Sequence, residues 1–192
     1  MAYKTKYDYL ENPQELNNEI INHKSNGSIS EEMKVEIPLM RLNFRRAENE
    51  LKNAEMIFKV SVNEIFKKEL DLLKEDTFYS SVISHAYYAI FFATKALLLK
   101  EKVRTKSPNI HKATLDAFVY YLISSGKLDV KLLNIYKSAI VKADSLLGLF
   151  VSEKDKRGTF TYQELSDANK EPAEESINNA NKFLTYVIRL MQ

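Results

Sequence analysis

Apolar side chains recur every three or four residues along most of this chain, the spacing that places them on one face of an α-helix. The pattern predicts helices over residues 39–73, 78–100, 108–124, 129–153 and 172–191. No stretch shows the sustained alternation that is typical of a half-buried strand. The predicted fold class is therefore all-α, an antiparallel up-and-down helical bundle of about five helices.

The first part of the chain is more polar and predicts an extension in front of the bundle. Asn12 and Pro13 are residue types preferred at the N-cap and the first position of a helix, so they predict a short helix followed by a loop over His23–Ser30. We therefore expect an N-terminal extension over residues 1–38 and a helical bundle domain over residues 39–192.

Proline and glycine predict further helix ends. Ser107 and Pro108 are typical of a serine cap with proline at the first helical position, and Gly126 is typical of a left-handed helix end. The connections are mostly short, apart from the eighteen residues from Lys154 to Glu171. Long ordered connections in compact domains often carry function, so this one is a candidate site.

Composition narrows the functional classes. Charged residues make up 28% of the chain and nearly cancel, with a net charge of +2, which is not typical of a polybasic nucleic-acid binder. A local basic site remains compatible with that balance. The absence of cysteine excludes disulfides, thiolate zinc sites and thiol catalysis. With no signal-like or membrane-length apolar run, we expect a cytoplasmic protein with no membrane partner.

The remaining motifs argue against bound metals and cofactors. Metal-binding helical bundles use Glu-x-x-His pairs, and none of the histidines, His23, His85 and His111, lies three residues after a glutamate. The glycines are isolated, so neither a phosphate loop nor a dinucleotide fingerprint is present. We expect no protein metal site and no cofactor.

Two histidines have simple structural interpretations. His85 lies beside the apolar stripe of its predicted helix, where a core-edge histidine would bond to a neighbouring helix. His111 lies in the first turn of the next predicted helix, where it would be solvated or would cap that turn.

The stretch KRGTFTY carries the main candidate chemistry. Lys156 and Arg157 place cations near a predicted helix end, and Gly158 is a suitable helix stop, so helix capping explains this part. Capping does not explain the hydroxyls of Thr161 and Tyr162 that follow. The planar arginine fork suits phosphate, and tyrosine offers a stacking face, so the group could also hold a nucleotide or an RNA backbone. Both interpretations remain open.

The string SHAYYAIFF, Ser84–Phe92, resembles the second-helix signature of HEPN domains, the higher eukaryote and prokaryote nucleotide-binding domains. The resemblance continues through His111 to the KRG-x-x-TY connection and the EPAEES start of the last helix. It covers about Leu39–Met191, nearly the whole periodic region.

This resemblance implies an antiparallel bundle that forms a homodimer about a two-fold axis. Many HEPN proteins are metal-independent ribonucleases, often toxins of toxin–antitoxin or phage-defence systems. Some are paired with a nucleotidyltransferase antitoxin that adds AMP to a tyrosine near the signature arginine. Others bind nucleotide or act as scaffolds.

The ribonuclease signature in this family is an arginine and a histidine with four to six residues between them. Arg157 matches the arginine, but the slot at residues 162–164 holds Tyr-Gln-Glu. Tyrosine has an ordinary pKa near 10 and is a poor base at pH 7. His85 is a second departure, because relatives commonly carry arginine at this position.

The resemblance makes Arg157 and Tyr162 the catalytic candidates. The candidate nucleotide- or RNA-binding residues are Lys156, Arg157, Thr161, Tyr162, His85 and His111. We expect nucleotide or RNA binding, with RNA cleavage left open by the missing histidine. The alternative is a non-catalytic helical module that binds a partner or acts as a scaffold.

Overall fold

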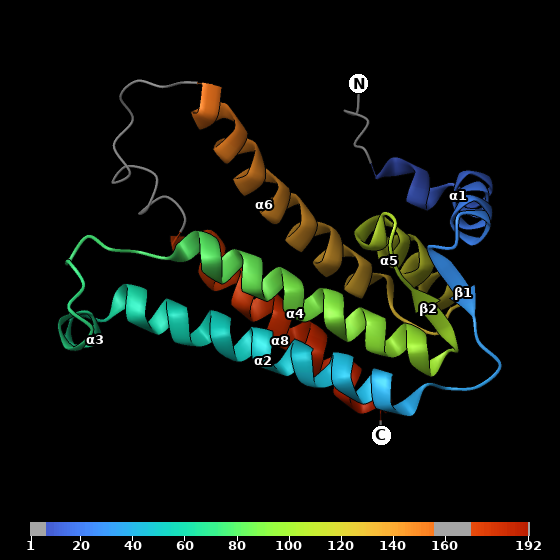
Figure 1. The fold of residues 1–192 in the computed structure, drawn as a ribbon, viewed down its shortest axis with the longest axis horizontal. Helices are drawn as coiled ribbons and strands as arrows, with labels where there is room; N and C mark the ends of the chain where they lie inside the picture. The colour runs from blue at the N-terminus through green and yellow to red at the C-terminus, as the bar shows by residue number, and fades with distance from the viewer. Residues whose placement is uncertain (1–6, 156–169, 192) are drawn as a thin grey trace. The chain divides into compact units, whose positions relative to one another are not determined.

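A computed structural model describes residues 7–155 and 170–191 of the chain, which are mostly helical, with one small sheet and connecting turns and loops (Figure 1). The chain divides into two compact units, each described here by itself. The N-terminal unit contains the residues up to Phe44 together with Phe91–Leu133. The bundle unit contains the described residues of Arg45–Ile90 and Asn134–Leu190. The predicted division at residue 38 stays a prediction.

In chain order the described elements are η1 (Asp8–Glu11), α1 (Pro13–Ser25), β1 (Ile29–Glu31), α2 (Ile37–Val62), α3 (Glu64–Glu69), α4 (Tyr79–Lys100), β2 (Val103–Thr105), α5 (Ile110–Phe118), η2 (Val119–Ile123), α6 (Val130–Asp155) and α8 (Lys170–Met191). The predicted all-α fold is confirmed. The helices predicted over 78–100, 129–153 and 172–191 correspond to α4, α6 and α8, and their predicted ends differ from the observed ones by at most two residues.

Helices α2 and α4 pack antiparallel in the bundle unit. Glu50 on α2 contacts His85 on α4. Further along α2, Phe58 lies against the earlier residue Tyr79 of α4, with ring centroids 6.0 Å apart, so the two helices run in opposite directions. Figure 1 shows the two helices side by side. A helical hairpin therefore forms one side of this unit.

Helices α6 and α8 form the second antiparallel pair. Lys142 bridges to Glu175 at 2.7 Å, and the ring of Tyr136 meets Phe183 edge-on at 6.2 Å. Tyr136 also lies 6.5 Å from Tyr87 of α4, so the two helical pairs share one aromatic core. Aromatic pairs in this geometry stabilise a core beyond the area they bury.

Helix α4 is the most apolar of the described helices. It is long and apolar enough to cross a membrane, but 78% of the residues in its most apolar window are buried inside the structure. Its wide apolar stripe is therefore satisfied by packing, as in the core helix of a globular protein.

The prediction of one unbroken helix over 39–73 is wrong. Helix α2 ends at Val62, and the Asn63 side chain accepts hydrogen bonds from the backbone N–H groups of Ile65 and Phe66, which starts α3. Asparagine at this position competes with the helix backbone and favours a new N-cap. The apolar periodicity continues through the break, so it could not reveal the cap.

The N-terminal unit begins with the short helix that the sequence predicts. Asn12 caps α1 by accepting from the N–H groups of Gln14 and Glu15, and Pro13 occupies the first helical position. The helix extends to Ser25, so the predicted loop over His23–Ser30 is partly wrong.

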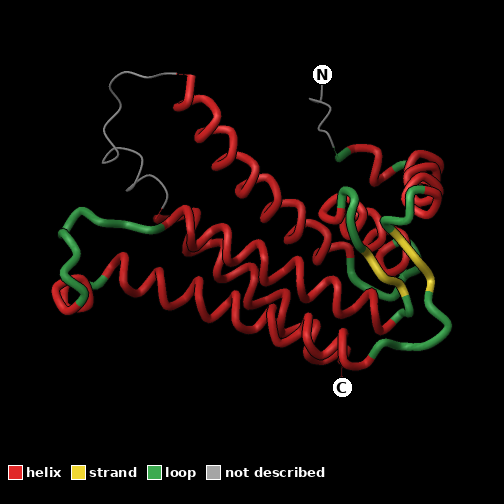
Figure 2. Tube along the Cα trace, in the orientation of Figure 1, coloured by secondary structure: helices red, strands yellow, loops and turns green. Residues whose placement is uncertain are grey.

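A two-stranded antiparallel sheet was not expected from the sequence. Strand β1 pairs with β2 in the register Ile29 to Thr105, Ser30 to Arg104 and Glu31 to Val103 (Figure 2). Each strand has only three residues, too few to produce a visible alternation of apolar and polar positions.

The predicted start of the third helix is also wrong. Helix α5 begins at Ile110, and its N-cap is Asn109 in the left-handed conformation, with no capping hydrogen bond from the side chain. Ser107 and Pro108 precede the helix instead of forming its first turn. At the other end, Gly126 adopts the predicted left-handed conformation with φ of 72°.

Replacing Phe183 with alanine tests the shared aromatic core of the bundle unit. Phe183 is 0% exposed, so we expect Phe183→Ala to lower the free energy of unfolding by about 3–5 kcal/mol. Tyr186→Ala is the matched control, because Tyr186 on the same helix is 48% exposed, and its loss should stay below about 1 kcal/mol. Urea denaturation measures both values, and equal losses would contradict the described packing.

Candidate functional site

Four of the six predicted site residues lie outside the described residues: Lys156, Arg157, Thr161 and Tyr162. The other two, His85 and His111, lie in different units, and each is described with its own neighbours.

His85 forms a close pair with a carboxylate in the bundle unit. Its Nδ1 lies 2.6 Å from Oε2 of Glu50, joining α4 to α2. The side chains are 32% and 23% exposed, so the pair lies at the surface edge of the bundle. The expectation of a core-edge histidine bonded to a neighbouring helix is therefore confirmed.

The Glu50 contact determines what the imidazole can do. An ionised carboxylate only accepts hydrogen bonds, so Nδ1 donates and the neutral ring keeps its lone pair on Nε2. Within the described part of the chain, Nε2 of His85 has no hydrogen-bond partner, and it is not among the fully buried polar atoms. A carboxylate-oriented imidazole with an accessible second nitrogen can accept a proton from a ligand hydroxyl.

His111 has a different environment in the N-terminal unit. Its ring stacks on Phe91 with centroids 4.5 Å apart, and the ammonium group of Lys95 lies 5.7 Å from the same phenyl ring. Burial, with a smaller contribution from the positive charge of Lys95, lowers the pKa of His111 below its ordinary value of 6.5. His111 is exposed in the first turn of α5, as expected for a solvated histidine, and its ring also stacks on Phe91.

A buried carboxylate organises the N-terminal unit. Asp116 on α5 is 0% exposed, and three groups donate to it: the Tyr9 hydroxyl at 2.6 Å, His23 Nε2 at 2.9 Å and Lys112 Nζ at 2.7 Å. Lys112 also bonds to Glu19 at 2.6 Å. Together these contacts join η1 and α1 to α5.

This network changes the pKa values of its members. Burial, followed by the hydrogen bond and charge of Asp116, raises the pKa of the Tyr9 hydroxyl well above its usual range. Burial acts to lower the pKa of Lys112, but the hydrogen bonds and charges of Asp116 and Glu19 outweigh it, and the pKa is raised. The network therefore keeps Tyr9 protonated and Lys112 charged.

Glu19, His23 and Asp116 also have the geometry of a candidate cation site, with ligand atoms within 4.8 Å of one another. The Lys112 ammonium already lies between the two carboxylates and compensates their charge. Glu19 and His23 lie one turn apart on α1, but Asp116 comes from α5, so sequence spacing alone could not assemble this cluster. The predicted absence of a metal site stays a prediction.

Glu50 and Asp116 are not among the residues that the sequence predicts for a site. Asp116 left a visible signal, because it lies in the apolar run ATLDAFV, where a carboxylate is buried only with partners. Glu50 gives no such signal in the sequence, since glutamate is common on exposed helix faces.

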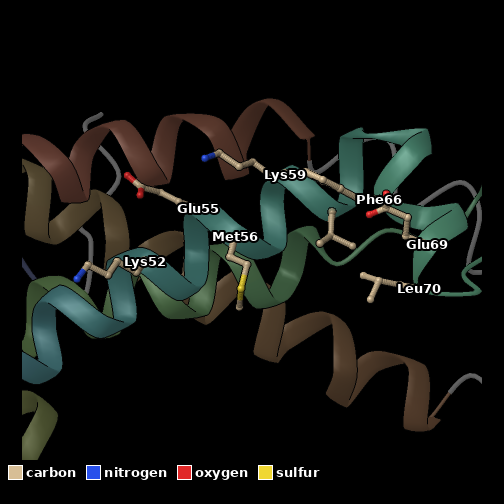
Figure 3. A pocket seen from close by; sticks show the side chains of 8 residues that line it. Lys52, Glu55, Met56, Lys59, Phe66, Glu69 and Leu70 are labelled. Carbon is tan, nitrogen blue, oxygen red and sulfur yellow. The ribbon is translucent and has the colours of Figure 1, made fainter.

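A pocket of about 450 Å³ lies between α2 and α3 in the bundle unit (Figure 3). Its apolar lining comes from Met56, Val60, Phe66 and Leu70, and its polar lining from Lys52, Glu55, Lys59 and Glu69. Exposed apolar side chains beside charged ones are typical of surfaces that bind another protein.

Comparison with known proteins supports the resemblance. The sequence model of the HEPN domain matches residues 63–190, which include His85 and His111. "Putative toxin MJ0142" of Methanocaldococcus jannaschii is 26% identical over 149 residues, covering 77% of this chain and 84% of that protein. "Putative toxin MJ0605" of the same organism is 32% identical over 75 residues, covering 39% of this chain and 51% of that protein.

Removing the Asp116 carboxylate should destabilise the fold. Asp116→Ala leaves Tyr9, His23 and Lys112 without their shared acceptor, so we expect a loss of about 3–5 kcal/mol in the free energy of unfolding. The exposed pair of Lys24 and Glu31 provides the control, and Lys24→Ala should cost no more than about 1 kcal/mol. A loss for Asp116→Ala as small as the control's would show that the network contributes little.

NMR titration of the three histidines tests the environment of His111. Its pKa should lie below 6.5, and Lys95→Gln should move it partly upward. Since the folded-state pKa is the lower one, the neutral ring stabilises the fold fully above the unfolded pKa. This contribution is lost as the pH falls through the folded-state pKa. A pKa above 6.5 would contradict the partial desolvation of this stacked ring.

Proposed function

The chain belongs to the HEPN domain family, and we propose that it is a toxin-type member that binds RNA and cleaves it without a metal ion. The names of both relatives support the toxin class. The 2.6 Å contact between His85 and Glu50 is the main observation in support of cleavage. It orients an imidazole in a chain whose arginine motif contains no histidine.

Each residue has a defined role in this proposal. Lys156 and Arg157 hold the scissile phosphate through charge-assisted hydrogen bonds. His85 Nε2 accepts the proton of the ribose 2′-hydroxyl as that oxygen attacks phosphorus. Tyr162 gives its phenolic proton to the 5′-oxygen that leaves, so the products are a 2′,3′-cyclic phosphate and a 5′-hydroxyl. Thr161 adds a hydroxyl donor to the phosphate.

The family also suggests a cellular setting for the proposed activity. We infer a cytoplasmic homodimer, in which two copies of the motif act at one RNA strand. A nucleotidyltransferase antitoxin is the proposed partner, and the hydroxyl of Tyr162 is the group to which it would add AMP. Modification there would block both the tyrosine proton and the approach of phosphate to Arg157.

A non-catalytic module is the second candidate function. Two observations favour it: the motif histidine is missing, and Met56, Phe66 and Leu70 line an exposed pocket. Such a module could still bind nucleotide or RNA at Arg157 but would have no use for an oriented imidazole.

RNA cleavage by the purified protein in EDTA tests the proposal. His85→Gln removes the proposed base and should slow cleavage by about 10²–10⁴-fold. Glu50→Gln should lower the rate less and shift its pH profile, because the carboxylate orients the ring. Glu48→Gln, two residues earlier on the same helix, is the matched control and should leave the rate unchanged.

Arg157→Ala should lose both RNA binding and cleavage. If Arg157 and His85 act on one phosphodiester, combining Arg157→Ala with His85→Gln will reduce the cleavage rate by much less than the product of the two single reductions. Cleavage that survives His85→Gln at the original rate would reject the proposed base. RNA binding that depends on Arg157, with no cleavage by any version, would establish the binding module.

A further inference from the structure

A second small pocket, of about 190 Å³, lies in the N-terminal unit, where α4, β2 and the segment before α5 meet. Its polar lining consists of Lys95, Arg104, Thr105, Lys106 and Ser107, and its apolar lining of Leu39, Leu99 and Ile110. None of these residues belongs to the arginine motif or to the His85 pair.

All the charged side chains that line this pocket are positive. Three cationic side chains line it, and no carboxylate is among its lining residues. Arg104 is paired with Glu36 at 3.1 Å, but within the described ranges Lys106 makes no ion pair. The pocket therefore keeps an uncompensated positive charge and would attract an anion.

The pocket is also built in advance of any ligand. The Lys106 N–H donates to the carbonyl of Ser28 at 2.9 Å, and the Ser28 hydroxyl donates to the Pro108 carbonyl at 2.6 Å. Thr105 is fixed from the other side, because its hydroxyl lies 2.9 Å from that of Thr114. A preorganised site avoids much of the entropy cost of ordering its groups when a ligand binds.

We propose that this pocket binds a phosphate group of an RNA strand. Its volume is below the range of about 300–1,000 Å³ typical of sites that enclose a whole small ligand, so it suits a single phosphate. Lysine and arginine beside a hydroxyl donor, here Ser107, form the usual surroundings of a backbone phosphate. The RNA source rests on the proposed function, whereas the phosphate chemistry rests on the pocket alone.

RNA binding by the full chain tests this site. The probe is a fluorescently labelled single-stranded RNA, and its affinity is measured across a range of salt concentrations. Lys106→Gln should weaken binding and reduce the slope of log K against log salt by about 0.7–1, the value for one lost phosphate contact. Lys34→Gln, an exposed lysine of the same unit outside the pocket, should leave the slope unchanged.

The outcomes separate this inference from the proposed function. If Arg157→Ala abolishes RNA binding but Lys106→Gln behaves like Lys34→Gln, the pocket inference is overturned and the proposed function stands. If the wild-type protein binds no RNA, the proposed function fails and inorganic phosphate becomes the second probe. Thermal stabilisation by phosphate that is lost in Lys106→Gln would then support a site for free phosphate, and its absence would reject the site altogether.

Discussion

The buried carboxylate of Asp116 is the interaction on which the N-terminal unit depends. A charge with no exposed surface is tolerated in a protein only when paired and hydrogen-bonded, and Tyr9, His23 and Lys112 provide those partners. Because Tyr9 and His23 lie on η1 and α1, the same bonds attach the polar N-terminal segment to α5. Strand β1 follows α1 directly, so its pairing with β2 depends on that attachment. The shape of the pocket around Lys95, Arg104 and Lys106 depends on it as well.

The bundle unit uses a carboxylate differently. Glu50 pairs with His85 at the surface edge, where both side chains keep partial contact with water. Such a pair contributes little to stability but determines which ring nitrogen carries the proton. The chain lacks the family's motif histidine, and this pair supplies an oriented imidazole from another helix. In the proposed ribonuclease, this contact is what fits His85 for the role of the base.

Much of the fold was predictable because its signals are local. The 3.6-residue period located α4, α6 and α8, and the Asn12 cap predicted α1. The break at Asn63 was missed because the apolar periodicity continues through it, and the start of α5 at Ile110 was missed because Ser107 and Pro108 resemble a helix start two residues earlier. Of the candidate site, the sequence identified His85 and its core-edge position but not its partner.

The sequence alone determined the all-α class, the family and the residue types available for chemistry. Helix periodicity and capping arise from contacts within a few residues, which are visible in any linear sequence. Tertiary structure decided the pairs: Glu50 lies 35 residues from His85, and Tyr9 lies 107 residues from Asp116. Which polar groups meet across such separations depends on how the helices pack, and no local pattern specifies it.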